Sequence, residues 1–255
     1  MNILISNDDG INSKALQTLV KELSDLGNIY VVAPDSERSA NSHHFTMKGS
    51  MRIEEKKLEG AKEAYALWGT PCDCIHAGLL FIIKDHIDLV VSGINKGWNT
   101  SNDAIYSGTV AAAREGFMQG KKAIALSLNT FEDRDYSLAA SISKEIIIEY
   151  LKHDTPNYFL NVNIPDCKKE DIKGYKICEE KGYVKYDENY YYTEEFGVKY
   201  LNLGKTEIDL QFDQNDMNID ASALMNNYIT IVPLDNDQIS HNYIKEVKDI
   251  FDSQL

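Results

Sequence analysis

Two adjacent carboxylates, Asp8 and Asp9, are the first residues in the chain that could do chemistry. They follow an apolar run at residues 1–6 and precede Gly10. Such a run is typical of a strand buried on both faces of a parallel sheet. Because ligands gather at the carboxyl ends of parallel strands, the pair is placed where it could hold a metal ion. Asp and Gly are also common in turns and helix caps, and a plain turn is the competing interpretation.

Two more apolar runs end in polar loops, which favours the metal site over the plain turn. Residues 29–33 lead into the loop 34–41, and residues 87–91 lead into the loop 92–99. Three strands of this kind would bring oxygen-bearing side chains to one edge of a sheet. Residues 13–27, which join the first two strands, have apolar side chains at helical spacing. We therefore predict a βαβ unit with a right-handed crossover.

A second chemical pattern, Ser107-Gly108-Thr109, precedes the alanine-rich residues 110–117. The alanines predict a helix, so the three residues would lie at its N-terminus. Free backbone N–H groups, the positive end of the helix dipole and two hydroxyls together suit a phosphate group. Gly108 would let an anion approach the backbone closely. An ordinary serine or threonine cap is the alternative interpretation.

Several motifs occur in order along the chain, at residues 7–10, 33–39, 69–74, 91–95, 106–110, 161–165 and 228–234. Together they resemble the SurE family of survival proteins, the metal-dependent nucleotidases. The resemblance implies a hydrolase that acts on nucleoside 5′- and 3′-monophosphates. It also implies a homodimer or homotetramer built by exchanged elements.

The resemblance further implies that one divalent cation per subunit is held by Asp8, Asp9, Ser39 and Asn95. All four side chains offer oxygen, which favours Mg²⁺ or Mn²⁺ over a soft-ligand metal. We expect direct attack by water on the phosphate, with Asp9 assisting proton transfer. The cradle at residues 107–109 would hold the remaining phosphate oxygens. A phosphorylated Asp8 intermediate is the alternative.

Other polar residues near these motifs have weaker roles in the prediction. Asn99 lies in the loop before the cradle and is predicted to contact the substrate, although Asn is also a common turn former. His43 and His44 are adjacent, and we interpret both as structural or substrate-flanking residues rather than metal ligands. Trp98 stands where the family usually has Pro. The segment 174–203 is rich in tyrosine and lysine where the family tends to have arginine, so the choice of nucleotide stays open.

Two rival functions have less support from the residues. A haloacid dehalogenase-type phosphatase needs Asp-x-Asp, whereas Asn7 and Asp9 flank Asp8 here. A non-catalytic nucleotide-binding or regulatory module on a Rossmann-like scaffold is the remaining alternative. No Gly-x-Gly-x-x-Gly follows the first strand, which weakens that alternative.

Composition excludes some partners. The 255 residues include 26 Lys and Arg against 40 Asp and Glu, a formal net charge of −14. Such a charge argues against a protein that coats nucleic acid or binds an anionic membrane surface. We find no apolar segment long enough to span a bilayer and no signal peptide, and we expect a cytoplasmic protein. Four cysteines without disulfide or zinc spacing predict reduced thiols.

The expected fold is α/β, a Rossmann-like three-layer sandwich with a mostly parallel central sheet. We predict a single domain over residues 1–255, with its core at about 1–170 and 226–235. Alternating aromatic and polar residues predict a β-hairpin extension at about 171–212. In the C-terminal segment, about 236–255, we predict a helix at residues 240–251 that serves oligomerisation together with the extension.

Overall fold

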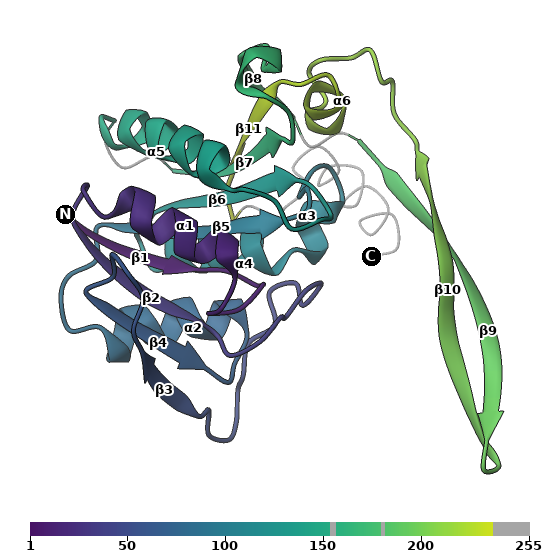
Figure 1. The fold of residues 1–255 in the computed structure, drawn as a ribbon, viewed down its shortest axis with the longest axis horizontal. Helices are drawn as coiled ribbons and strands as arrows, with labels where there is room; N and C mark the ends of the chain where they lie inside the picture. The colour runs from purple at the N-terminus through teal and green to yellow at the C-terminus, as the bar shows by residue number, and fades with distance from the viewer. Residues whose placement is uncertain (154–156, 180–181, 237–255) are drawn as a thin grey trace, which may run out of the picture.

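The computed structural model describes residues 1–153, 157–179 and 182–236 (Figure 1). Within them, nine strands form one sheet: β1 (Asn2–Ser6), β2 (Asn28–Pro34), β3 (Ile53–Lys56), β4 (Glu63–Leu67), β5 (Leu89–Lys96), β6 (Lys122–Asn129), β7 (Phe159–Pro165), β8 (Tyr175–Ile177) and β11 (Ile229–Leu234). Their order is β3-β4-β2-β1-β5-β6-β7-β11-β8. The pairs from β4 through β7 are parallel, whereas β3 and β11 run antiparallel to β4 and β7.

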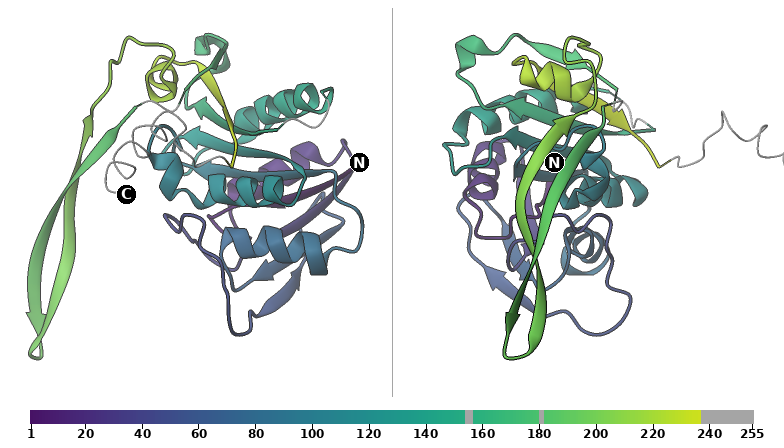
Figure 2. Two further views of the ribbon diagram at one scale, coloured as in Figure 1. Left: turned by 180° about the vertical axis from the view of Figure 1, so that it is seen from behind. Right: turned by 90° about the vertical axis from the view of Figure 1, so that its right-hand side faces the viewer.

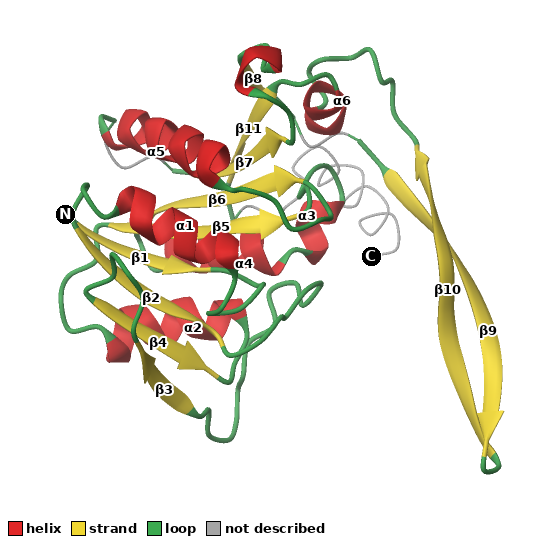
Figure 3. Cartoon of the chain, viewed as in Figure 1, coloured by secondary structure: helices red, strands yellow, loops and turns green. Residues whose placement is uncertain are grey.

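Helices cover both faces of the sheet (Figure 3). They are α1 (Lys14–Leu23), α2 (Pro71–Ala77), α3 (Asp103–Tyr106), α4 (Gly108–Met118), α5 (Ser137–Leu151) and α6 (Asp220–Met225), with a π-helical turn at Gly78–Ile82 and a 3-10 turn at Lys169–Asp171. α1 and α5 pack on one face, and α2 and α4 on the other (Figures 1 and 2). The predicted α/β fold with a mostly parallel sheet is confirmed.

The core has two layers because successive side chains of a buried strand point to opposite faces. In β1, Ile3 and Ile5 join the layer beneath α1 and α5, whereas Leu4 joins the layer beneath α2 and α4. All three side chains are fully buried. The uninterrupted apolar run that predicted this strand therefore reflects two-sided burial.

Helix caps set where the functional helices begin. The Ser13 side chain accepts a hydrogen bond from the N–H of Leu16 and caps α1. Thr70 and Asp73 bond reciprocally to each other's backbone N–H, a capping box that starts α2. Ser107 caps α4 by accepting from the N–H of Val110. The cap that the sequence analysis gave as the alternative interpretation of this motif is thus present.

A long two-stranded hairpin projects from the body of the molecule (Figure 2). It consists of β9 (Val184–Glu195) and β10 (Val198–Leu210), paired antiparallel. Its two-residue turn has positive φ at both Phe196 and Gly197, the backbone shape that suits the twist of a hairpin. At its base, the side chain of Asn102 bonds both the N–H and the carbonyl of Val184, at 2.6 and 3.0 Å.

The hairpin extension begins later in the sequence than predicted. β8 pairs with β11 in the main sheet, so the extension begins near Val184 rather than at residue 171. The helix predicted at residues 240–251 lies outside the described residues. All four cysteines are free thiols, in agreement with the sequence analysis. Among the described helices, none combines the length and apolar character needed to cross a membrane.

Candidate active site

Asp8 lies directly after β1 and is 4% exposed. Its Oδ1 accepts a hydrogen bond of 2.5 Å from the hydroxyl of Thr109, and the Thr109 backbone N–H also bonds the carboxylate. Burial raises the pKa of Asp8, against the lowering effect of these hydrogen bonds. The N-terminus of α4 therefore meets a buried carboxylate rather than open solvent.

Gly108 makes this approach possible. A Cβ at that position would lie 3.1 Å from Asp8 Cβ, 3.2 Å from Asp8 Oδ2 and 3.2 Å from Pro71 Cγ. Such distances are tighter than ordinary side-chain packing allows. The sequence analysis assigned this glycine to the approach of an anion. In the structure the group that approaches it is the Asp8 carboxylate.

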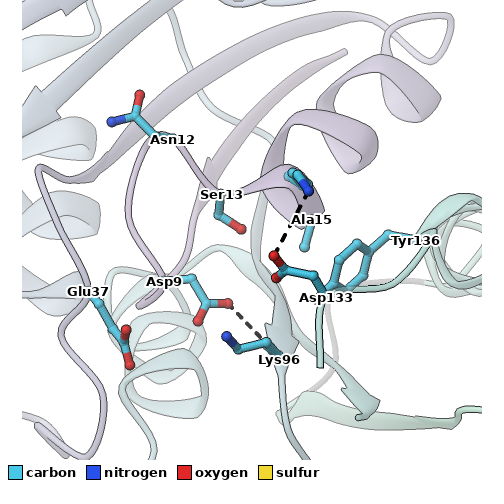
Figure 4. Close-up of a pocket in the computed structure, with 9 residues that line it drawn as sticks. Asp9, Asn12, Ser13, Ala15, Glu37, Lys96, Asp133 and Tyr136 are labelled. Atoms are coloured by element: carbon cyan, nitrogen blue, oxygen red, sulfur yellow. Dashed lines mark hydrogen bonds and ion pairs between the residues drawn. The ribbon is translucent and has the colours of Figure 1, made fainter. Parts of the chain in front are cut away.

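Asp9 is half-buried beside Asp8 and faces a cavity (Figure 4). Its Oδ2 accepts a hydrogen bond of 3.2 Å from the backbone N–H of Lys96. Burial, followed by the negative charge of Asp8, raises the pKa of Asp9 to about 6. The cavity, about 260 Å³ in volume, is lined by Asp9, Asn12, Ser13, Lys14, Ala15, Glu37, Lys96, Asp133 and Tyr136.

Asn95 reaches the site on β5, which is irregular at this point. Ser92 pairs with Ala125 and Asn95 pairs with Ser127, so β5 has one residue more than β6 over this stretch. Such a bulge changes the direction of the side chains that follow it. The Asn95 side-chain nitrogen donates to the carbonyl of Gly97 at 2.9 Å, so the amide oxygen is the atom suited to a cation.

Ser39 lies on the loop after β2, and this loop is attached to the first carboxylate. The N–H of Arg38 donates to the backbone carbonyl of Asp8 at 2.7 Å. The Ser39 side chain is exposed and its hydroxyl donates to Glu37 Oε1 at 2.7 Å. The loops after β1 and β2 are thus joined by their backbones next to the two predicted ligands.

These four residues fit a hard divalent cation by the type of their donors. Two carboxylates, one hydroxyl and one amide supply only oxygen, as Mg²⁺ and Mn²⁺ prefer. Burial raises the pKa of both carboxyls, and the charge of Asp8 raises that of Asp9 further, so a bound cation would stabilise their ionised forms. Among the described residues, no three His, Cys, Asp or Glu side chains group together as metal ligands. Any cation here would accordingly complete its shell with Ser, Asn, water or substrate oxygens.

Asn99 lies in a buried hydrogen-bond network, and its contact with substrate stays a prediction. It is 6% exposed, and its side-chain nitrogen donates to the hydroxyl of Ser127 at 2.8 Å. Its N–H donates to Asn163 Oδ1, and its carbonyl accepts from the side chains of Asn161 and Asn163. This network ties the loop before α3 to β6 and β7. A structural role for Asn99 follows directly from it.

Comparison with known proteins adds an independent finding. The family model described as survival protein SurE matches residues 3–186. The chain belongs to the SurE family. Proteins named 5′-nucleotidase SurE from Clostridium botulinum strains Alaska E43 and Eklund 17B are each 40% identical to it over 257 residues. In both cases the match covers 99% of this chain and 100% of the relative. The family predicted from the motifs is confirmed.

A solved SurE structure has the same fold. The SurE protein from Aquifex aeolicus superimposes with a TM-score of 0.81 at 31% sequence identity. The match covers 98% of this chain and 100% of that one. The α/β sheet described above is thus a SurE fold.

Sequence reasoning missed several residues around this SurE site. Lys96, Asp133 and Tyr136 line the cavity beside Asp9, but no local pattern marks them. Asn161 and Asn163 belong to a motif that supported the family resemblance, yet their bonds to Asn99 were not foreseen. Their two-residue spacing on a strand, which places both on one face, was the available signal.

Proposed function

We propose that this SurE-family protein hydrolyses nucleoside 5′- and 3′-monophosphates to nucleoside and phosphate, using one divalent cation per subunit. Mg²⁺ or Mn²⁺ would be held by Asp8, Asp9, Ser39 and Asn95. The relatives named 5′-nucleotidase support the reaction class. The hydrogen bond between Thr109 and Asp8 is the observation that most supports the site, because it joins the carboxylate pair to a helix N-terminus.

The proposed chemistry is direct attack by water on phosphorus. When bound, the cation polarises the phosphate and lowers the pKa of a bound water molecule. Asp9 is the group that would accept a proton from that water, because its side chain faces the cavity beside Asp8. The cradle at Ser107, Gly108 and Thr109 would stabilise the phosphate oxygens as negative charge develops. Thr109 already donates to Asp8, so the Gly108 N–H and the Ser107 O–H would be the cradle's donors to phosphate.

The decisive test is phosphate release from a panel of nucleoside monophosphates. Protein stripped of metal should be inactive, and Mg²⁺ or Mn²⁺ should restore release. The Asp8→Asn variant keeps an oxygen that can accept from Thr109 but loses the charge, so it should remain inactive with either metal. Rapid acid quenching tests the alternative of a phosphorylated Asp8, since a covalent phosphoenzyme would be trapped.

The competing function is a nucleotide-binding module without catalysis. It predicts tight nucleotide binding without metal and unchanged nucleotide after long incubation. Isothermal titration followed by chromatography of the bound nucleotide separates the two proposals. Turnover that depends on metal would exclude the module.

We also infer that the protein forms a homodimer or homotetramer through the β9–β10 extension. An isolated two-stranded hairpin is at best marginally stable in water, and exposed apolar patches mark interfaces. Tyr190, Tyr192, Leu201 and Leu203 are each more than half exposed, and cross-strand pairing places them on one face. The single-domain organisation and the cytoplasmic location stay predictions, which limited proteolysis and cell fractionation would test.

A further inference from the structure

Glu115 on α4 is a nearly buried carboxylate that the proposed reaction does not use. Its side chain is 6% exposed. His43 Nε2 lies 3.0 Å from Glu115 Oε2, and His76 Nδ1 lies 2.8 Å from Glu115 Oε1. Gln119, the residue that directly follows α4, donates to Oε1 at 2.9 Å. We refer to Glu115, His43 and His76 as the Glu115 clasp.

The clasp joins three segments that are distant in the sequence. His43 belongs to the loop after β2, His76 to α2 and Glu115 to α4. Hydrogen bonds from His43 lower the pKa of Glu115 to about 2, with a further lowering from His76 against the effect of burial. Each carboxylate oxygen is occupied by an imidazole nitrogen. The cluster is therefore a structural connection rather than an open binding site.

The loop that His43 attaches also carries Ser39, and its backbone is strained. Ala40 and Ser42 have φ values of 55° and 52°, in the left-handed region that residues with a Cβ rarely adopt. Such conformations are strained and persist only where surrounding contacts impose them. The loop therefore needs attachment on both sides of the strained residues.

Attachments on both sides are present. Before the strained residues, the N–H of Arg38 bonds the carbonyl of Asp8. Ser42, itself the second strained residue, donates its hydroxyl to the carbonyl of Ile105 at 2.6 Å and its N–H to the carbonyl of Tyr106 at 2.8 Å. His43 is the next residue. Its hydrogen bond to the ionised Glu115 carboxylate is stronger than a bond between two neutral groups.

His76 contacts the same loop from the other side. Its ring meets the ring of Phe45 edge-on, with centroids 4.7 Å apart. Further along, Thr46 donates to both oxygens of Asp73 and the carbonyl of His44 accepts from Thr70. These last contacts hold the loop at residues 44–46. The bond between His43 and Glu115 is the attachment that directly follows the strained residues.

We propose that Glu115, acting through His43, is a positioning residue for Ser39. It holds the strained loop against α4 so that the Ser39 hydroxyl is available to the cation at Asp8 and Asp9. The inference rests on the proposed function in one respect, since it takes Ser39 as a cation ligand. Residues that orient metal ligands typically change metal affinity about 10- to 100-fold when they are replaced.

The test is Mn²⁺ binding to the metal-free protein, with free Mn²⁺ measured by electron paramagnetic resonance and no nucleotide present. Glu115→Gln and His43→Ala should each weaken Mn²⁺ binding about tenfold or more. His43→Gln places an amide nitrogen near the position of the lost Nε2 and should restore most of the affinity. Gln119→Ala is the matched control, because it removes a bond to Glu115 from the end of α4 and leaves the loop attached.

Kinetics give a second readout that general destabilisation would not imitate. In Glu115→Gln and His43→Ala, the Mn²⁺ concentration for half-maximal phosphate release should rise about tenfold. The kcat at saturating Mn²⁺ should stay within about twofold of the wild type, because the clasp touches no reacting atom. A fall in kcat alone, with unchanged Mn²⁺ dependence, would overturn the assignment.

The outcomes separate the inference from the function on which it rests. If the wild type binds no Mn²⁺, the proposed cation site fails and the inference fails with it. If the wild type binds Mn²⁺ and His43→Ala binds it equally well, only the inference fails. Should Glu115→Gln not fold, the pair His43→Ala and His43→Gln decides the matter, because His43 is 29% exposed and its replacement leaves the core intact.

Discussion

Thr109 donates its hydroxyl to the carboxylate of Asp8 across 101 residues of sequence, at a distance of 2.5 Å. This bond fixes the N-terminus of α4 against the end of β1. Both residues are nearly inaccessible to solvent: Thr109 is 0% exposed and Asp8 is 4% exposed. One proposed cation ligand is therefore hydrogen-bonded directly to the proposed phosphate cradle.

Replacing Asp8 should abolish the stabilisation of the folded protein by Mg²⁺. Burial raises the pKa of Asp8, so ionised Asp8 costs folding free energy at neutral pH when no cation is bound. Asp8→Asn removes that cost, and its melting temperature without metal should equal or exceed that of the wild type. Added Mg²⁺ should raise the melting temperature of the wild type only. Differential scanning fluorimetry with and without Mg²⁺ gives both values, and a variant stabilised by Mg²⁺ would contradict Asp8 as a ligand.

Gly108→Ala should damage activity more than stability. The added methyl group would lie about 3 Å from Asp8 and displace it from the α4 N-terminus. We expect kcat/KM to fall about 10- to 100-fold, as small displacements of reacting groups do. Steady-state phosphate release measures the effect. Gly116→Ala is the contrasting control: its methyl group would meet Val90 at 2.7 Å, so it should lower the melting temperature with little effect on the metal dependence.

The Glu115 clasp should make stability depend on pH in the acid range. The pKa of Glu115 is lowered from 4.5 to about 2 in the folded protein, so its stabilising effect is complete above pH 4.5 and is lost as the pH falls toward 2. A shift of that size corresponds to about 3 kcal/mol. Urea unfolding of wild type and Glu115→Gln between pH 2 and 7 should show the difference narrowing below pH 4.5. A constant difference over this range would mean that Glu115 does not titrate as described.

Charge on the extension should change the oligomeric state. Tyr192 and Leu201 are directly paired across β9 and β10 and are 74% and 58% exposed. Lysine at either position would place a charge in the proposed interface, so we expect smaller particles by light scattering after gel filtration. Leu80→Lys is the control, because Leu80 is 62% exposed on the body of the molecule. If all three variants had the same particle mass as the wild type, this face of the extension would be excluded as the interface.

The central strands and the start of α4 were predictable because their signals are local. Two-sided burial leaves an uninterrupted apolar run, as in β1, and a cap leaves a serine at the right position, as at Ser107. β3 and β4 were not predicted. β3 reads Ile-Glu-Glu-Lys and lies at the edge of the sheet, where partly exposed polar residues hide the strand pattern.

The contacts between side chains were the least predictable part of the site. His43 was expected to be structural rather than a ligand, and its bond to Glu115 agrees with that expectation. Its partner, however, lies 72 residues away, and no local pattern links the two. Asn99 was expected in an open loop, where asparagine forms turns, but long-range bonds to β7 bury it. Such pairings depend on tertiary packing that a single sequence does not display.

The order of the strands has a consequence for synthesis of the chain. β1 lies between β2 and β5, so the first strand made becomes an inner strand of the sheet. All four proposed ligands precede residue 96, and α4 is complete at Met118. β11, which pairs with β7 on one side and β8 on the other, is made more than 100 residues later. A chain emerging from the ribosome therefore contains every proposed ligand long before the strand that completes its sheet.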